Sequence, residues 1–191
     1  MARNKEFDEQ EVLNKAMEVF WKQGYEKTSL QDLVDHMDIH RRSIYDTFGD
    51  KRALFMKALM HYEETITTRI QKKIESTIMV KQAIRDVFEV VIHSDDQYPK
   101  GCLTVNAAVE LSLLDQEVSK RVTEMFEKTE ILFYDLLIYG QETGEISKSL
   151  DAKGLSHFIH NSLVGLRVLA KTMEDQKKME SIVDLTLSTL E

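Results

Sequence analysis

The sequence predicts an all-α protein of about nine helices, and three observations lead to this fold class. Apolar residues recur at three- and four-residue spacings along almost the whole chain, which is the period of an amphipathic helix. The 191 residues include one proline and seven glycines, so the two residue types that interrupt helices are scarce. No segment shows the two-residue alternation of a convincing β-strand.

The composition limits the class of protein further. A hydrophobic fraction of 42% can bury a core, and the lone Cys102 excludes an intramolecular disulfide, which fits a reducing cytoplasm. The first ten residues contain no apolar core of a signal peptide, and no run approaches the ~20 apolar residues of a membrane span. We therefore expect a cytoplasmic protein without a membrane partner.

Each expected helix begins or ends at a recognisable boundary residue. Gly24 and Gly49 suit the left-handed position that ends a helix, and Asp50 can cap the helix that follows. Thr28, with Gln31 three positions later, predicts a capping box at the start of the second helix. The expected helices are 8–22, 28–37, 40–48, 51–74, 79–93, 103–114, 117–141, 151–173 and 175–190.

The second and third helices predict a helix-turn-helix. Both are short, a turn of about four residues joins them, and the longer first helix braces them. The net charge of −8 argues against general affinity for nucleic acid, but residues 40–52 carry four basic side chains against two acidic ones. We expect any DNA binding to come from this focused patch, through a helix that enters the major groove.

The residues around these two helices resemble the signature of the TetR family of transcriptional regulators. The run 24–34 has the family's pattern, and Tyr45, Phe48 and Lys51 reproduce its tyrosine, phenylalanine and lysine at three-residue spacings. Further along, the segments 101–103 and 106–108 are similar to the C-terminal domain of one large subgroup. The resemblance implies a helix-turn-helix domain at 1–50 and a ligand-binding and dimerisation domain at 51–191.

The resemblance also implies the function: a homodimeric repressor, not an enzyme, that binds a palindromic operator in double-stranded DNA until a small-molecule inducer releases it. Hydroxyl groups and backbone amides would contact phosphate, and the arginines that open the third helix would read bases. The expected DNA contacts are Thr28, Ser29, His40, Arg41, Arg42, Ser43, Tyr45 and Lys51.

Three positions depart from the family's pattern. Asp38 stands in the turn where glycine is usual, and Asp tolerates a left-handed conformation better than most residues. His40 stands where a serine often caps the third helix, which predicts a weaker cap. Arg42 stands where small residues often follow, which makes the operator hard to infer from relatives.

The rest of the chain is expected to hold the effector and to dimerise. Polar residues on otherwise apolar helices, together with aromatic side chains, are the candidates for ligand contact, although most aromatics at helical spacing are core. The expected ligand contacts are Phe88, Asn106, Glu110, Phe126, Phe158 and Asn161, with His93 as a further candidate. The last two helices, 151–173 and 175–190, carry more apolar surface than one core needs, which favours a four-helix dimer interface.

Several alternatives remain open. Cys102 near a helix start can act as a thiol sensor or as a buried structural cysteine. His157 and His160 have a spacing that can chelate metal, but no carboxylate or cysteine partner is evident, so we expect neither a metal nor a cofactor. A helical enzyme or small-molecule carrier is disfavoured, because the chain has no phosphate-binding glycine loop and no nucleophile motif. A helical adaptor without DNA binding is disfavoured by the ordered match to the family's motif from Thr28 to Lys51.

Overall fold

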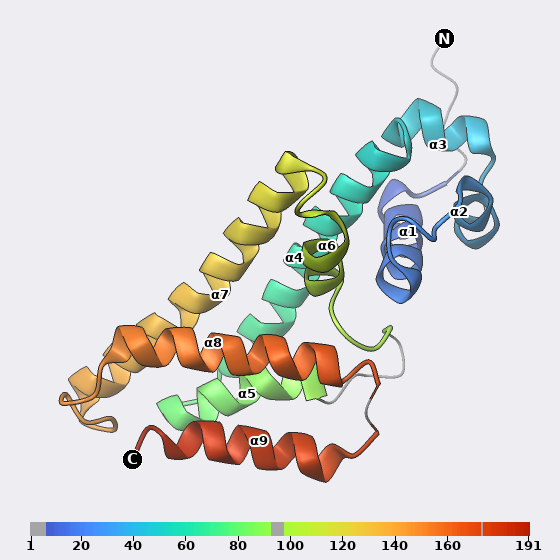
Figure 1. Cartoon of the computed structure of the whole chain (residues 1–191). Coiled ribbons are helices and arrows are strands. Elements are labelled where there is room, and N and C mark those ends of the chain that lie inside the picture. The colour runs from blue at the N-terminus through green and yellow to red at the C-terminus, as the bar shows by residue number, and fades with distance from the viewer. Residues whose placement is uncertain (1–6, 93–97, 173) are drawn as a thin grey trace.

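The computed structural model describes residues 7–92, 98–172 and 174–191, and these residues form nine α-helices without a strand (Figure 1). The all-α prediction is therefore confirmed. The helices are α1 Glu9–Gln23, α2 Leu30–Met37, α3 Arg41–Phe48, α4 Lys51–Ile74, α5 Val80–Ile92, α6 Leu103–Leu111, α7 Gln116–Thr143, α8 Ala152–Leu169 and α9 Gln176–Ser188.

The first three helices gather around the N-terminal half of α4 at one end of the molecule (Figure 1). Phe20 of α1 meets Phe55 of α4 edge to face, with ring centroids 5.1 Å apart. Trp21 and Tyr62 repeat this arrangement between the same two helices at 4.7 Å. This core continues through Leu103 into α6, so the first three helices are joined to the rest of the chain by packed side chains.

A second core lies at the other end, where α5, α8 and α9 stack beside α7 and the last turns of α4 (Figure 1). Phe88 of α5 and Phe133 of α7 are both fully buried, with ring centroids 6.1 Å apart. The long helices α4 and α7 contribute to both cores. A change in the second core can therefore be transmitted along these helices towards α1–α3.

The start of α2 differs from the sequence prediction. Ser29, and not Thr28, is the N-cap, and the capping box closes with Asp32 rather than with Gln31. The reason is that the Thr28 side chain is buried and its hydroxyl donates to the carbonyl of Gly24 at 2.5 Å. Thr28 thus closes the turn before α2, and the following serine takes the cap.

Other expected boundaries agree to within a few residues, with two exceptions at helix ends. The structure ends α6 at Leu111 and α8 at Leu169, earlier than the sequence predicts. His93 and Met173, the expected last residues of two helices, lie outside the described residues. Among the helices that the structure describes, none is both long and apolar enough to cross a membrane.

Candidate nucleic-acid interface and effector cavity

Helix α3 presents a polar face to the outside because its apolar residues face the core. Ile44 is fully buried and Phe48 nearly so, and both pack with α1, α2 and α4. Three positions around them, Arg41, Arg42 and Tyr45, are exposed, and 47% of the Tyr45 side chain surface is open to solvent. The helix therefore has the two-sided character that a recognition helix needs.

The turn between α2 and α3 has the conformation that the sequence predicts. Asp38 is left-handed, with φ 55° and ψ 42°, and its N–H donates to the carbonyl of Val34 at 3.1 Å. His40 is the N-cap of α3 and its side chain accepts no capping hydrogen bond. The expectation of a weak cap is thus confirmed, and the first turn of α3 has no capping side chain, although the Ser43 N–H donates to the His40 carbonyl at 2.8 Å.

The residues predicted to contact DNA differ in their exposure to solvent and in their present partners. Arg42 lies 3.5 Å from Asp46 in a highly exposed ion pair, and Lys51 places its ammonium 4.2 Å from the ring centroid of Tyr25. By exposure, Thr28 is buried, Ser43 and Lys51 are half-buried, and Ser29, His40, Arg41, Arg42 and Tyr45 are exposed. The structure brings most of these side chains to the surface of α3 and the helix starts beside it.

Arg52 does not belong to this basic surface, although it counts toward the local positive charge in the sequence. Its guanidinium donates to Asp115 at 2.6 and 2.9 Å and to Glu117 at 2.8 Å. These hydrogen bonds hold the pKa of Asp115 down at about 2. The sequence could not reveal this, because both partners lie more than sixty positions away.

Two residues predicted to bind ligand join α6 to the helix-turn-helix instead. The carboxylate of Glu110 accepts hydrogen bonds from the backbone N–H groups of Tyr25 and Glu26, at 2.9 and 2.8 Å. Asn106 donates to the carbonyl of Trp21 at 3.0 Å and accepts from Lys171 at 2.7 Å. A motion of α6 would therefore pull directly on the end of α1 and on the turn that precedes α2.

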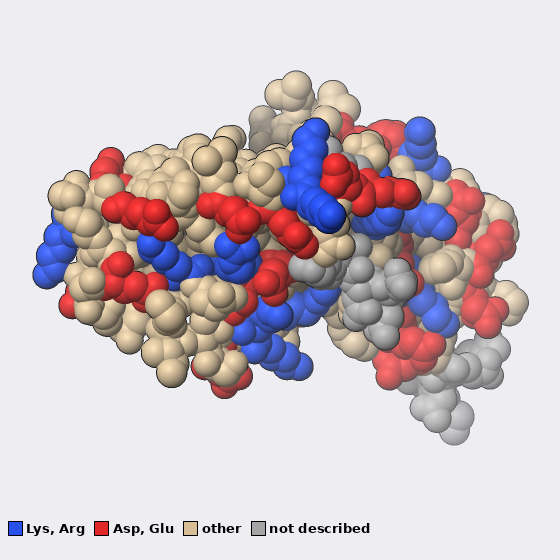
Figure 2. Space-filling model, turned by 90° about the horizontal axis from the view of Figure 1, so that it is seen from below, with Lys and Arg blue, Asp and Glu red and all other residues tan. Residues whose placement is uncertain are grey.

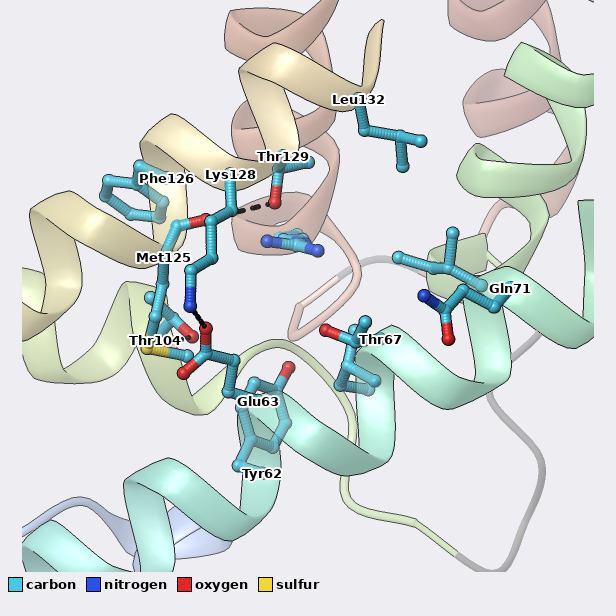
Figure 3. Close-up of a pocket in the computed structure, with 13 residues that line it drawn as sticks. Tyr62, Glu63, Thr67, Gln71, Thr104, Met125, Phe126, Lys128, Thr129 and Leu132 are labelled. Atoms are coloured by element: carbon cyan, nitrogen blue, oxygen red, sulfur yellow. Dashed lines mark hydrogen bonds and ion pairs between the residues drawn. The ribbon is translucent and has the colours of Figure 1, made fainter.

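A cavity of about 230 Å³ lies between α4, α6, α7 and α8 (Figure 3). Of the six residues predicted to bind ligand, only Phe126 lines it. Phe88 is fully buried against Phe133, while Phe158 and Asn161 are exposed on α8. Aromatic and polar residue types alone do not show which face of a helix lines the cavity. For this reason the residues predicted to bind ligand differ from the observed lining.

The cavity combines apolar walls with a few polar groups. Tyr62, Thr67 and Thr104 line it with hydroxyl-bearing side chains, and Glu63 pairs with Lys128 at 2.8 Å (Figure 3). Glu63 also pairs with Arg121. Arg167 of α8 also lines the cavity, and only 5% of its surface is exposed. Its signal in the sequence is a single arginine within the apolar run 163–169.

Cys102 is 1% exposed and is the N-cap of α6, beside Tyr62. Burial, then the neighbouring thiol, raises the pKa of Tyr62 well above its ordinary value. The phenol is therefore a hydrogen-bond donor at neutral pH. Burial agrees with the structural reading of Cys102, and thiol sensing stays a prediction.

His157 and His160 face a carboxylate rather than each other. Nε2 of His157 lies 3.2 Å from Glu130, and Nδ1 of His160 lies 3.9 Å from the same side chain. Burial, followed by the charge of Arg167, lowers the pKa of His160. Within the described ranges, no group of three or more His, Cys, Asp or Glu side chains is placed to hold a metal.

Acidic and basic side chains are interspersed on the face of the molecule seen from below in Figure 2, which is turned away from α3. The net charge of the chain is −8. Overall charge of this sign does not favour binding to DNA, so a nucleic-acid interface on this chain requires a local basic surface.

Comparison with known proteins gives consistent results over the whole chain. Residues 12–58 match the family "Bacterial regulatory proteins, tetR family", and residues 79–185 match "Tetracyclin repressor-like, C-terminal domain". The uncharacterized HTH-type transcriptional regulator YezE of Bacillus subtilis (strain 168) is 37% identical over the full length of both chains. The HTH-type transcriptional repressor ComR of Escherichia coli (strain K12) is 27% identical, over 97% of this chain and 90% of its own.

Solved structures agree with this assignment. A cysteine-substituted form of the TetR-family regulator CifR, complexed with 26-bp double-strand operator DNA, superposes with a TM-score of 0.90. It is 26% identical and the match covers all of both chains. With its exposed recognition helix, its nine-helix order and these full-length matches, the chain belongs to the TetR family of helix-turn-helix transcriptional regulators.

Proposed function

We propose that this chain is a homodimeric repressor that binds a palindromic operator and leaves it when a small molecule enters the cavity between α4, α6, α7 and α8. The single observation that carries the proposal is the exposed basic face of α3, held outward by buried Ile44 and Phe48. ComR is named a repressor, and CifR is complexed with operator DNA, which supports the same role here. Such a regulator has no catalytic role and acts in the cytoplasm.

Arg41 and Arg42 are the proposed base readers. Both are exposed at the start of α3, and a guanidinium can donate two hydrogen bonds to one guanine. The ion pair between Arg42 and Asp46 is highly exposed, so it costs little to exchange for a contact with DNA. His40 and Ser43 flank these arginines and would contribute contacts to the adjacent backbone or base edges.

Three other groups would position the protein on phosphates. Tyr45 is exposed one turn beyond Arg41, and Lys51 begins α4 beside Tyr25. Ser29 is the exposed N-cap of α2, and its hydroxyl accepts from the Asp32 amide while its own proton remains available to donate to a phosphate. Thr28 would act by holding this turn, since its hydroxyl is already engaged with the Gly24 carbonyl.

Dimerisation would use one face of α8 together with α9. Phe158, Asn161, Gly165 and Val168 are all exposed, and their spacings of three and four residues place them in one stripe. A side chain at Gly165 would meet nothing within 4 Å in the single chain, which leaves room for a partner helix. Leu185 of α9 is 71% exposed, and burying these apolar groups favours association.

Some apolar residues of α8 are already buried within the subunit, so only part of the helix is open to a partner subunit. Ile159, Leu163 and Leu166 are buried within the subunit. They belong to the second core and cannot also contact a partner. We therefore restrict the proposed interface to the stripe that begins at Phe158 and to Leu185.

Release would depend on α6, which lies between the cavity and the helix-turn-helix. Thr104 of α6 lines the cavity, and Glu110 at the other end of the same helix binds the turn before α2. A ligand that favours one position of α6 would change the separation of the two recognition helices. Half-sites one helical turn apart require about 34–36 Å, so a small tilt reduces affinity.

Selection of bound duplexes from a random DNA library tests the proposal. The native protein should enrich a palindromic sequence, and an Arg41→Ala/Arg42→Ala variant should not. Lys177→Ala, an exposed basic residue on α9, is the matched control and should enrich the same motif as the native protein. Failure of the native protein to enrich any sequence at low salt would refute the proposed function.

A further inference from the structure

Among the residues that the structure describes, Arg167 is a buried cation without a counter-charge. Its side chain is 95% buried on α8, and its Nε atom is fully enclosed without a hydrogen-bond partner. Within the described part of the chain, no carboxylate lies within 4.0 Å of its guanidinium. A buried charge in this state is strongly unfavourable, because the water that solvated it has not been replaced.

The acidic side chains nearest to the cavity do not supply that counter-charge. Glu63 is the carboxylate that lines it, and this group already pairs with Lys128 and Arg121 (Figure 3). Glu130 lies instead against His157 and His160. The Glu63 carboxylate is thus matched by two cations, and the charge of Arg167 remains in excess on the cavity wall.

Neutral donors and an apolar wall complete the surroundings of Arg167. Tyr62 lines the cavity, and its buried phenol keeps its proton at neutral pH. Ile66, Phe126 and Leu132 provide apolar surface from α4 and α7. The volume of about 230 Å³ lies below the ~300–1,000 Å³ that is usual for ligand pockets, which favours a small occupant.

We propose that the effector is a small organic acid whose carboxylate pairs with Arg167 and whose apolar part contacts the wall formed by Ile66, Phe126 and Leu132. A planar carboxylate can accept two hydrogen bonds from one guanidinium. This inference rests on the proposed function, since it assigns the class of molecule that occupies the effector cavity. It also gives the buried arginine a role that packing within the chain does not explain.

Calorimetric titration of the full-length protein without DNA tests this inference. The probes are the straight-chain acids from acetate to octanoate, with benzoate, phenylacetate and 4-phenylbutanoate, each beside its own primary amide. At least one acid should bind saturably, and its amide should bind at least about tenfold more weakly. Inorganic phosphate alone should not bind, because it cannot use the apolar wall.

Variants locate the effect at Arg167. Arg167→Met should abolish the preference for acid over amide, and Arg167→Lys should restore part of it, because the charge returns without the fork of donors. Arg85→Met is the matched control: Arg85 pairs with Asp184 away from the cavity, and its loss should leave the preference unchanged. An unchanged preference in Arg167→Met would overturn the inference.

Thermal unfolding separates this role from a structural one. Removal of an unpaired buried charge should leave the unfolding midpoint of ligand-free Arg167→Met equal to or above that of the native protein. A large fall in that midpoint would assign Arg167 to structural stabilisation and contradict the inference. So would equal binding of acid and amide, tight binding of phosphate alone, or no acid binding up to about 10 mM.

The two proposals fail in different measurements. If no acid binds while the native protein still enriches a palindrome, the effector class is wrong and the repressor assignment stands. If acids bind through Arg167 but no DNA is enriched, the cavity is assigned correctly and the proposed function is not.

Discussion

The carboxylate of Asp115 accepts two hydrogen bonds from the guanidinium of Arg52, at 2.6 and 2.9 Å, and so joins the first turn of α4 to the start of α7. Asp115 is also the N-cap of α7, accepting from the N–H groups of Glu117 and Val118. One side chain thus fixes α7 to the segment that follows the recognition helix. The hydrogen bond from Arg52 is the main reason that the pKa of Asp115 falls to about 2.

This pKa predicts how stability depends on pH. Because the folded pKa of Asp115 lies below the ordinary value of 3.8, its contribution is complete above about pH 4. It is lost as pH falls from about 4 to about 2. Asp115→Asn keeps an effective cap but removes the charge, so it should lower the free energy of unfolding at pH 7 and show a smaller decline over this interval. Urea unfolding at pH 7 and at lower pH measures both effects, and identical pH profiles for the two proteins would contradict the prediction.

Loss of the Glu110 carboxylate should destabilise the fold at the turn before α2. Glu110→Ala leaves the N–H groups of Tyr25 and Glu26 without their acceptor, which should cost about 1–3 kcal/mol in free energy of unfolding. Glu127→Ala, at an exposed site on α7, is the control and should change stability by less than about 0.5 kcal/mol. Chemical denaturation measures both variants, and equal stabilities would show that the link through Glu110 contributes nothing.

The hydroxyl of Tyr45 should contribute to operator affinity without contributing to folding. Its side chain is 47% exposed, and loss of one hydrogen bond to phosphate in Tyr45→Phe should weaken binding about tenfold. Tyr139→Phe is the matched control, because that tyrosine is 54% exposed on α7 and its loss should change nothing. Fluorescence anisotropy with the selected duplex measures the affinities; if Tyr45→Phe matches the control, the phosphate contact is excluded.

Introduction of negative charge on the exposed stripe of α8 should produce a monomer. Phe158 is 46% exposed and Val168 is 49% exposed, so Phe158→Asp/Val168→Asp should preserve the fold while placing two like charges in the interface of each partner. Leu113→Asp is the control, since Leu113 is 99% exposed between α6 and α7. Sedimentation at micromolar concentration should give a dimer for the native and control proteins. A native monomer would overturn the interface.

Phe88 should matter for stability and not for effector binding. It is fully buried against Phe133, so Phe88→Ala should lower the free energy of unfolding by about 3–5 kcal/mol. Any folded fraction should keep the native preference for organic acids over amides, because Phe88 does not line the cavity. Chemical denaturation measures the stability and calorimetry measures the preference for acids. Loss of that preference in folded Phe88→Ala protein would show that Phe88 does affect ligand binding.

Local sequence patterns predicted the helices well because their causes are local. Apolar spacing, Gly24 and Asp50 all act within a turn or two of the helices that they define. The left-handed turn at Asp38 was predictable for the same reason. The shift of the α2 cap from Thr28 to Ser29 was not, because it depends on a hydroxyl buried against the Gly24 carbonyl, which requires knowledge of how the first turn closes.

The lining of the cavity between α4, α6, α7 and α8 could not be predicted from the sequence, since contacts between distant helices form it. Asn106 and Glu110 stood out as polar residues on an apolar helix, but they bind the backbone at Trp21, Tyr25 and Glu26. Arg167 lines the cavity and was not anticipated. A polar residue on an apolar helix therefore marks a contact between helices at Asn106 and Glu110 but an exposed position at Asn161, and tertiary packing decides between the two.

The salt dependence of operator binding tests the central claim most directly. The measurement is the dissociation constant of the native protein for its selected duplex over a range of salt concentrations, with the binding stoichiometry determined at the lowest. We predict two chains per palindrome, a steep linear loss of affinity with the logarithm of salt, and a loss of about 1–3 kcal/mol for Arg42→Ala that relaxes specificity at one base pair in each half-site. A shallow slope with equal affinity for unrelated duplexes, unchanged by Arg42→Ala, would contradict the assignment of α3 as the reading helix.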